Sequence, residues 1–154
     1  MKLLVDSREK WTQSNSSDVH LRNYFEKHSI EYEIRKLDCG DYMLEDNPLL
    51  SIDRKQSLEE LARNLMNRKD SSRFWREVRR CHSGGIKLVV LVESGPAVLG
   101  INQVPKWRSK YSPVTGRRLI DEMIRLEAAY GVRWVFTSRR STGKKIMEIL
   151  EGKT

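Results

Sequence analysis

The sequence has few metal-binding side chains and no long apolar run. It contains two cysteines, Cys39 and Cys81, and three histidines in 154 residues, with no CxxC pair and no paired histidine spacing. A zinc site is therefore not expected, and two thiols without a pairing pattern are typical of a reducing compartment. No segment approaches membrane-spanning length and the N-terminus lacks an apolar signal region, so we predict a cytoplasmic protein that does not contact membranes.

The charge of the chain is unbalanced toward basic residues. There are 29 Lys and Arg against 21 Asp and Glu, which gives a formal net charge of +8. Such an excess favours a polyanionic partner, with nucleic acid ahead of an anionic membrane surface. The hydrophobic content of 38% and four tryptophans exclude a disordered chain. With no linker and no internal repeat, residues 1–154 are expected to form one domain.

The apolar pattern predicts an α/β protein with the order β-α-β-β-β-α-α-β-α-β-α. Strands are expected at 2–5, 32–36, 42–44, 49–55, 88–92 and 132–136, and helices at 21–28, 58–65, 74–81, 119–130 and 142–150. We expect strands 32–55 to form an antiparallel meander that enters a central mixed β-sheet with parallel crossovers, flanked by α-helices.

The segment from Gly40 to Lys55 is the most informative part of the chain. We interpret it as a hairpin with a turn at Asn47-Pro48, whose second strand delivers Asp53, Arg54 and Lys55. Because side chains alternate along a strand, Asp53 and Lys55 share one face and Arg54 lies on the other, while the hairpin brings Asp41 close. Two carboxylates and a lysine suit a divalent cation beside a phosphate, although a solvated surface is the simpler alternative.

Further acidic residues follow predicted strand ends. Asp6, Arg8 and Glu9 come after the first apolar strand, where ligand sites of open α/β sheets collect. Glu59 lies near the start of the helix after the hairpin, within reach of its end, and could instead interact only with the helix dipole.

Basic residues recur in the second half of the chain. The segment 94–115 lacks periodicity and interleaves bases with aromatic residues, which suits contacts to a nucleic-acid backbone and bases. An extended loop packed by Trp107, with solvated charges around it, explains the same pattern. The candidate DNA contacts are Arg73, Lys106, Trp107, Arg108, Lys110, Arg117, Arg139, Arg140 and Lys144.

Taken in order, these motifs resemble the nuclease domain of the XPF family of structure-specific endonucleases, within the PD-(D/E)xK, restriction-endonuclease-like group. That family has V-D-x-R-E after its first strand, a G-D pair, the motif E-R-K-x3-D, an Arg-Phe pair, a strand ending in Glu, and a Tyr/Phe-Gly pair before the last strand. The corresponding residues here are Val5-Asp6-Ser7-Arg8-Glu9, Gly40-Asp41, Asp53-Arg54-Lys55 with Glu59, Arg73-Phe74, Val92-Glu93 and Tyr130-Gly131.

The resemblance implies roles for these residues. Asp41, Asp53 and the Arg54 carbonyl are expected to bind Mg²⁺ or Mn²⁺, and Lys55 to orient or deprotonate the attacking water. Asp6 and Glu9 would complete the acidic cluster, and Arg8 would contact the phosphate or hold the carboxylates. Glu59 would support Lys55 or the outer shell of the metal. Two acids are exchanged relative to the family, because Asp53 stands for Glu and Glu59 for Asp.

The implied function is metal-dependent hydrolysis of phosphodiesters in branched DNA, such as flaps, forks or junctions, in repair, recombination or replication. A four-way-junction resolvase, an RNA-cleaving nuclease, a non-catalytic DNA-binding pseudonuclease and a basic structural protein are the alternatives. We expect no helix-hairpin-helix module after residue 154. DNA binding and pairing are therefore expected from this domain, as a homodimer through apolar helix surface within 130–150, or from a partner protein. A prokaryotic or viral source would make the protein nucleoid-associated.

Overall fold

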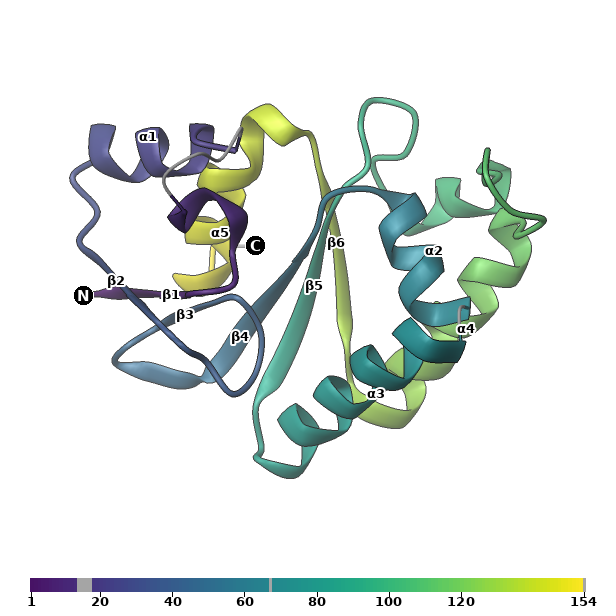
Figure 1. The fold of residues 1–154 in the computed structure, drawn as a ribbon, viewed down its shortest axis with the longest axis horizontal. Helices are drawn as coiled ribbons and strands as arrows, with labels where there is room; N and C mark the ends of the chain where they lie inside the picture. Colours follow the sequence, from purple (N-terminus) through teal and green to yellow (C-terminus); the bar gives the residue numbers. More distant parts are fainter. Residues whose placement is uncertain (14–17, 67, 154) are drawn as a thin grey trace.

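The computed structural model describes residues 1–13, 18–66 and 68–153, which form a six-stranded mixed sheet with helices on both faces (Figure 1). The strand order is β2-β1-β3-β4-β5-β6. The order of elements confirms the sequence prediction. The strands are β1 Leu3–Asp6, β2 Tyr32–Arg35, β3 Tyr42–Leu44, β4 Asn47–Lys55, β5 Lys87–Glu93 and β6 Arg133–Thr137. The α-helices are α1 His20–Lys27, α2 Leu58–Met66, α3 Arg68–Ser83, α4 Gly116–Tyr130 and α5 Thr142–Leu150, with short 3-10 turns η1 Lys10–Thr12, η2 Ile101–Lys106 and η3 Arg139–Ser141.

Strand direction brings several chain segments to one edge of the sheet. β3 is antiparallel to both β1 and β4, whereas β2 is parallel to β1, and β5 and β6 continue parallel to β4. The C-terminal ends of five strands therefore lie at the same end of the sheet, where β3 begins. Four charged residues lie at this end: Asp6 at the end of β1, Asp41 just before β3, Lys55 at the end of β4 and Glu93 at the end of β5.

The fold class is as predicted, but two details of the hairpin region are corrected. β2 does not join the meander, because it pairs in parallel with β1 at the outer edge, with Val5 opposite Ile34. The chain reverses at 45–46 rather than at Asn47-Pro48. Asn47 instead opens β4 opposite Leu44, and Pro48 follows near the start of the strand, where a missing N–H is tolerated.

Two apolar cores lie on opposite faces of the sheet. In Figure 1, α2, α3 and α4 cover one face, and α1 and α5 cover the other. β5 contributes to both, since Val90 and Val92 pack with the first group of helices and Val89 and Leu91 with the second. This confirms the prediction of a central strand buried on both faces.

The last helix uses its apolar side chains inside the chain. Ile146, Met147, Ile149 and Leu150 are all buried in the core shared with α1 and β1. These four side chains are therefore used within the chain, and the pairing surface predicted within 130–150 stays a prediction. None of the helices in the described ranges is both long and apolar enough to cross a membrane.

The two cysteines, which the sequence suggested were reduced thiols, form a disulfide. The Cα atoms of Cys39 and Cys81 are 5.6 Å apart, and 42 positions separate them in the sequence. The prediction was wrong because the pairing depends on α3 packing beside the segment between β2 and β3, a contact that spacing does not reveal. The bond therefore ties α3 to the segment that leads into Asp41.

Candidate active site

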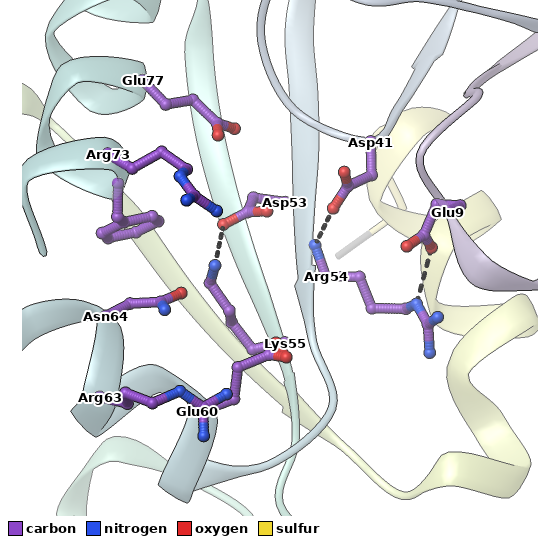
Figure 2. Close-up of a pocket in the computed structure, with 11 residues that line it drawn as sticks. Glu9, Asp41, Asp53, Arg54, Lys55, Glu60, Arg63, Asn64, Arg73 and Glu77 are labelled. Atoms are coloured by element: carbon purple, nitrogen blue, oxygen red, sulfur yellow. Dashed lines mark hydrogen bonds and ion pairs between the residues drawn. The ribbon is translucent and has the colours of Figure 1, made fainter. Parts of the chain in front are cut away.

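A polar cavity of about 320 Å³ opens at the C-terminal ends of the parallel strands, between β4 and helices α2 and α3 (Figure 2). Of the residues predicted to act in catalysis, it gathers Glu9, Asp41, Asp53, Arg54 and Lys55, and of the predicted DNA contacts Arg73. Phe74, which was noted in the sequence only as part of the Arg-Phe pair, also lines the cavity, and no site role was predicted for the remaining residues of its wall, which are Glu60, Arg63, Asn64 and Glu77.

Asp53 and Lys55 lie on the face of β4 that meets α2 and α3. Lys55 Nζ is 3.1 Å from Asp53 Oδ2 and 4.5 Å from the centre of the Phe74 ring. Burial would lower the pKa of the Lys55 ammonium, but the negative charges of Asp53 and Glu60 outweigh it and raise that pKa. Lys55 is therefore held as a cation in the cavity wall.

Asp41 reaches the same cavity from the start of β3. Its Oδ2 accepts a hydrogen bond of 2.8 Å from the backbone N–H of Arg54. Burial, and then the charges of Asp53 and Glu9, raise the pKa of Asp41 well above its ordinary range. The preceding Gly40 has φ +75°, and a Cβ there would lie 2.1 Å from Ser51 Oγ. Only glycine fits, which explains the Gly-Asp pair physically.

The Arg54 side chain points to the opposite face of β4, as alternation predicted. Its guanidinium is buried and bonds three carboxylates, with Nε 2.8 Å from Glu9, Nη1 3.1 Å from Glu93, and Nη2 on Asp18. Tyr42 also donates to Glu9 through its hydroxyl. Burial raises the pKa of Glu9, although Arg54 opposes the effect. Asp18 was missed because it lies in a polar link with no periodic signal.

Asp6 and Arg8 lie beside the cavity rather than in its wall. Asp6 is completely buried and accepts hydrogen bonds from the backbone N–H of Leu37 at 2.8 Å and from Arg8 Nε at 2.7 Å. The backbone N–H of Asp6 also donates to the carbonyl of Asp41 at 2.8 Å. This geometry joins the end of β1 to the segments around Leu37 and Asp41.

The structure corrects the placement of Glu59. Its carboxylate accepts hydrogen bonds from Ser109 Oγ and from the backbone N–H of Lys110, each at 2.8 Å, so it faces the loop before α4. Glu60 lines the cavity instead. Neighbouring residues of a helix point about 100° apart, so one step along α2 changes the face. The predicted cap of this helix is confirmed, because the Glu60 N–H donates to Ser57 Oγ at 3.0 Å.

Glu77 of α3 is the acidic residue that sequence reasoning missed in the cavity. Its Oε1 accepts a hydrogen bond of 3.0 Å from the backbone N–H of Gly40. Burial, and then the charge of Asp53, raise the pKa of Glu77 to about 7. Figure 2 shows its carboxylate facing Asp53 across the cavity, next to Arg73. Its position one turn after Arg73-Phe74 is the signal that could have found it.

Three consecutive residues before Asp41 are attached to α3. Arg80 Nε donates to the carbonyl of Asp38 at 2.6 Å, Cys39 is bonded to Cys81, and Gly40 donates to Glu77. The helix therefore fixes the backbone that carries Asp41 into the cavity.

The predicted DNA contacts other than Arg73 do not gather at the cavity. Trp107 packs against the core beneath α4, as the alternative reading of that loop proposed. Arg139 and Arg140 line a groove with α1 on the opposite side of the sheet, and Arg139 bonds Asp18 at 3.1 Å. The others are exposed at separate places, Lys106 in η2, Arg108 and Lys110 in the following loop, Arg117 in α4 and Lys144 in α5.

The cavity is chemically suited to a hard cation. In the part of the chain that the structure describes, no group of three or more Asp, Glu, His or Cys side chains is arranged around a common point. Asp41 and Asp53, however, are close enough for the charge of Asp53 to raise the pKa of Asp41. A divalent cation would relieve this repulsion, and Mg²⁺ commonly takes only one or two carboxylates and completes its shell with water.

A mixed sheet with carboxylates and a lysine at the end of a central strand defines the restriction-endonuclease-like fold of XPF nucleases. The chain belongs to the ERCC4 domain family, which matches residues 5–149 and confirms the resemblance seen in the sequence. XPF from Aeropyrum pernix superposes with a TM-score of 0.69 at 22% identity, over 98% of this chain and 64% of that one. The same protein in a complex with DNA gives 0.68 and 22%, over 97% and 63%. The chain thus spans just under two thirds of the length of XPF, and no curated protein matches its sequence.

Proposed function

We propose that the chain is a metal-dependent endonuclease that hydrolyses phosphodiesters in branched DNA during repair, recombination or replication. The observation that carries the proposal is the convergence of Asp41, Asp53 and Lys55 on one polar cavity. Membership of the ERCC4 domain family and the DNA complex of the structurally similar XPF support it.

Asp41, Asp53 and the backbone carbonyl of Arg54 would hold Mg²⁺ or Mn²⁺. The Arg54 N–H donates to Asp41, and an extended residue directs its N–H and C=O to the same side, so the carbonyl faces Asp41 too. The bound ion would lower the pKa of a water molecule and neutralise charge growing on the phosphate.

Lys55 would act as a cation rather than as a base. The charges of Asp53 and Glu60 raise its pKa despite burial, so it carries a proton at neutral pH. An ammonium can orient the attacking water by hydrogen bonding and stabilise negative charge on the phosphate. Of the two roles that the resemblance allowed for Lys55, the environment favours this one.

DNA would enter over α2 and α3, where Arg63 and Arg73 line the cavity. Both side chains are exposed and positively charged, which suits contacts to phosphates on either side of the cut. The net charge of +8 supports binding in general. The other basic residues predicted from the sequence would contact DNA farther from the cavity. The position of Asp41 would be supported by the neighbouring residues Asp6, Arg8 and Glu9.

The test is cleavage of labelled flap DNA with Mg²⁺ or Mn²⁺ by Asp41→Asn and Asp53→Asn. Both changes keep the size of the side chain, and we expect each to reduce the cleavage rate at least about 100-fold while DNA binding in gel shifts persists. Asp121→Asn, at an exposed position on α4, is the matched control. Full cleavage by both cavity variants would refute the assignment.

The same experiment separates the alternative functions. Flaps, forks, four-way junctions and RNA of one sequence, compared side by side, distinguish a flap nuclease from a resolvase or an RNA-cleaving enzyme. Binding without cleavage of any of them would identify a pseudonuclease. Salt-dependent binding with no metal dependence would favour a basic structural protein.

We further propose that residues 1–154 act as one nuclease domain, and that a homodimer or a partner protein completes DNA binding. Because the apolar residues of α5 are buried within the chain, pairing through the C-terminal helices would use the side chains that remain exposed on them. Sedimentation with and without flap DNA distinguishes a monomer from a dimer.

A further inference from the structure

A second cavity adjoins the candidate active site, and it lies beside the loop for which the sequence predicted general contacts to nucleic acid. It has a volume of about 450 Å³ and lies between α2 and the loop before α4. Ala62, Met66 and Val114 form an apolar floor, and Tyr111 stands at its edge. Arg63 lines both this cavity and the candidate active site, so the two cavities adjoin at this side chain.

The loop that presents Tyr111 is held in place by many hydrogen bonds. Ser109 Oγ donates to Glu59 and accepts from the backbone N–H groups of Tyr111 and Ser112 at 3.1 and 3.0 Å. The Ser109 N–H bonds the Val114 carbonyl at 3.1 Å, and Glu59 accepts a second bond from the loop backbone. Tyr111 is nevertheless 86% exposed. An ordered loop therefore carries a large aromatic ring into solvent, beside an apolar floor.

We propose that this second cavity binds an unpaired nucleobase of the strand whose phosphate occupies the candidate active site, with Tyr111 stacking on the base. The proposal rests on the proposed function and adds a specificity-determining residue to it. A base offers flat apolar faces to the ring and the floor, while Arg63 contacts the phosphate that joins the two cavities. A base within a duplex cannot leave its stack without an energetic cost, so this cavity favours unpaired DNA near the cut.

Glu59 acquires a positioning role in this arrangement. It occupies the last position of the family motif, yet it faces away from the metal side of the cavity and holds Ser109 and Lys110. Because Ser109 in turn holds Tyr111, the carboxylate sets the distance between the aromatic ring and the candidate active site. The exchange of Asp for Glu at this position extends the side chain by one methylene toward the loop.

The experiment uses flap DNA with 2-aminopurine in the single-stranded arm beside the junction, and the full chain carrying Asp53→Asn so that the DNA stays intact. Stacking quenches the fluorescence of the probe. We expect quenching on binding, its loss with Tyr111→Ala, and its retention with Tyr111→Phe, which keeps the ring. The affinity for flap DNA should fall about 5- to 150-fold with Tyr111→Ala, the range for one base–aromatic stack. Ile124→Ala, another exposed apolar residue, is the control.

Cleavage kinetics separate this proposal from the proposed function. In the otherwise unchanged chain, Tyr111→Ala should raise KM for flap DNA and leave KM for fully paired nicked DNA unchanged. Glu59→Ala should resemble Tyr111→Ala, and Glu59→Gln should restore part of the effect because its amide oxygen still accepts one bond. Equal quenching by Asp53→Asn with and without Tyr111→Ala would overturn the base-binding proposal, whereas cleavage by Asp53→Asn would overturn only the catalytic assignment.

Discussion

Glu77→Gln tests whether the cavity holds a carboxylate at a cost to stability. The variant keeps a carbonyl oxygen that can accept the Gly40 N–H at the 3.0 Å position of Glu77 Oε1. It removes the negative charge that faces Asp53. We therefore expect Glu77→Gln to stabilise the metal-free protein, which is unusual for a substitution of a residue in the site.

The expected increase in the stability of the Glu77→Gln variant depends on pH, and its sign follows from proton binding. Glu77 has an ordinary pKa of 4.5 when unfolded and a pKa of about 7 when folded, because burial and Asp53 disfavour its charge. Between these values the folded state binds more protons than the unfolded state, so stability falls as pH rises. The whole penalty is present above pH ~7 and amounts to at most about 3 kcal/mol. Glu77→Gln should be free of this loss.

Thermal unfolding at pH 5 and pH 8 without metal measures the effect. At pH 8 the variant should unfold about 6–12 °C above the unchanged chain, and at pH 5 the two should differ much less. Glu127→Gln, at an exposed position on α4, should show no difference at either pH. A variant that is destabilised at pH 8, or stabilised equally at both pH values, would refute the reasoning.

Two further predictions concern the parts that hold the site. The double variant Cys39→Ala, Cys81→Ala opens a loop closed over 42 positions, so urea unfolding should show a loss of about 4 kcal/mol in the free energy of unfolding. Reductant should destabilise the unchanged chain but not this variant. Equal sensitivity of the two proteins to reductant would contradict the role of the disulfide. Arg54→Met leaves three carboxylates buried without their cation, so the loss at pH 7 should be about 3–5 kcal/mol. That loss should shrink at acid pH as the carboxylates protonate, and a loss that is independent of pH would count against the cluster.

Local patterns predicted the fold and the centre of the site well. Helical periodicity and β-branched runs depend on neighbours a few positions apart, so the order of helices and strands could be predicted from the sequence. Alternation along β4 placed Asp53 and Lys55 on one face and Arg54 on the other, and the structure confirms this. The catalytic roles of these residues stay predictions.

Contacts between distant segments could not be predicted in the same way. The pairing of β2 with β1, the Cys39–Cys81 bond and the contact of Glu77 with Gly40 all join segments that packing brings together. The error at Glu59 has a different origin. The start of α2 and its Ser57 cap were predicted correctly, but which of Glu59 and Glu60 faces the cavity depends on how α2 packs against the sheet and the loop before α4.

The arrangement around Arg54 explains why an arginine stands between the two residues that face the cavity. Its side chain is fixed on one face of the sheet by carboxylates from three separate segments. Its backbone N–H donates to Asp41 at the neighbouring strand, and its neighbours in the chain, Asp53 and Lys55, point into the cavity on the other face. Because successive side chains of an extended strand alternate, and β4 is held extended by pairing with β5 as far as Lys55, an arginine side chain on one face goes together with Asp53 and Lys55 on the other. The buried ion cluster on the α1 and α5 side therefore anchors the strand that carries the candidate active site on the α2 and α3 side.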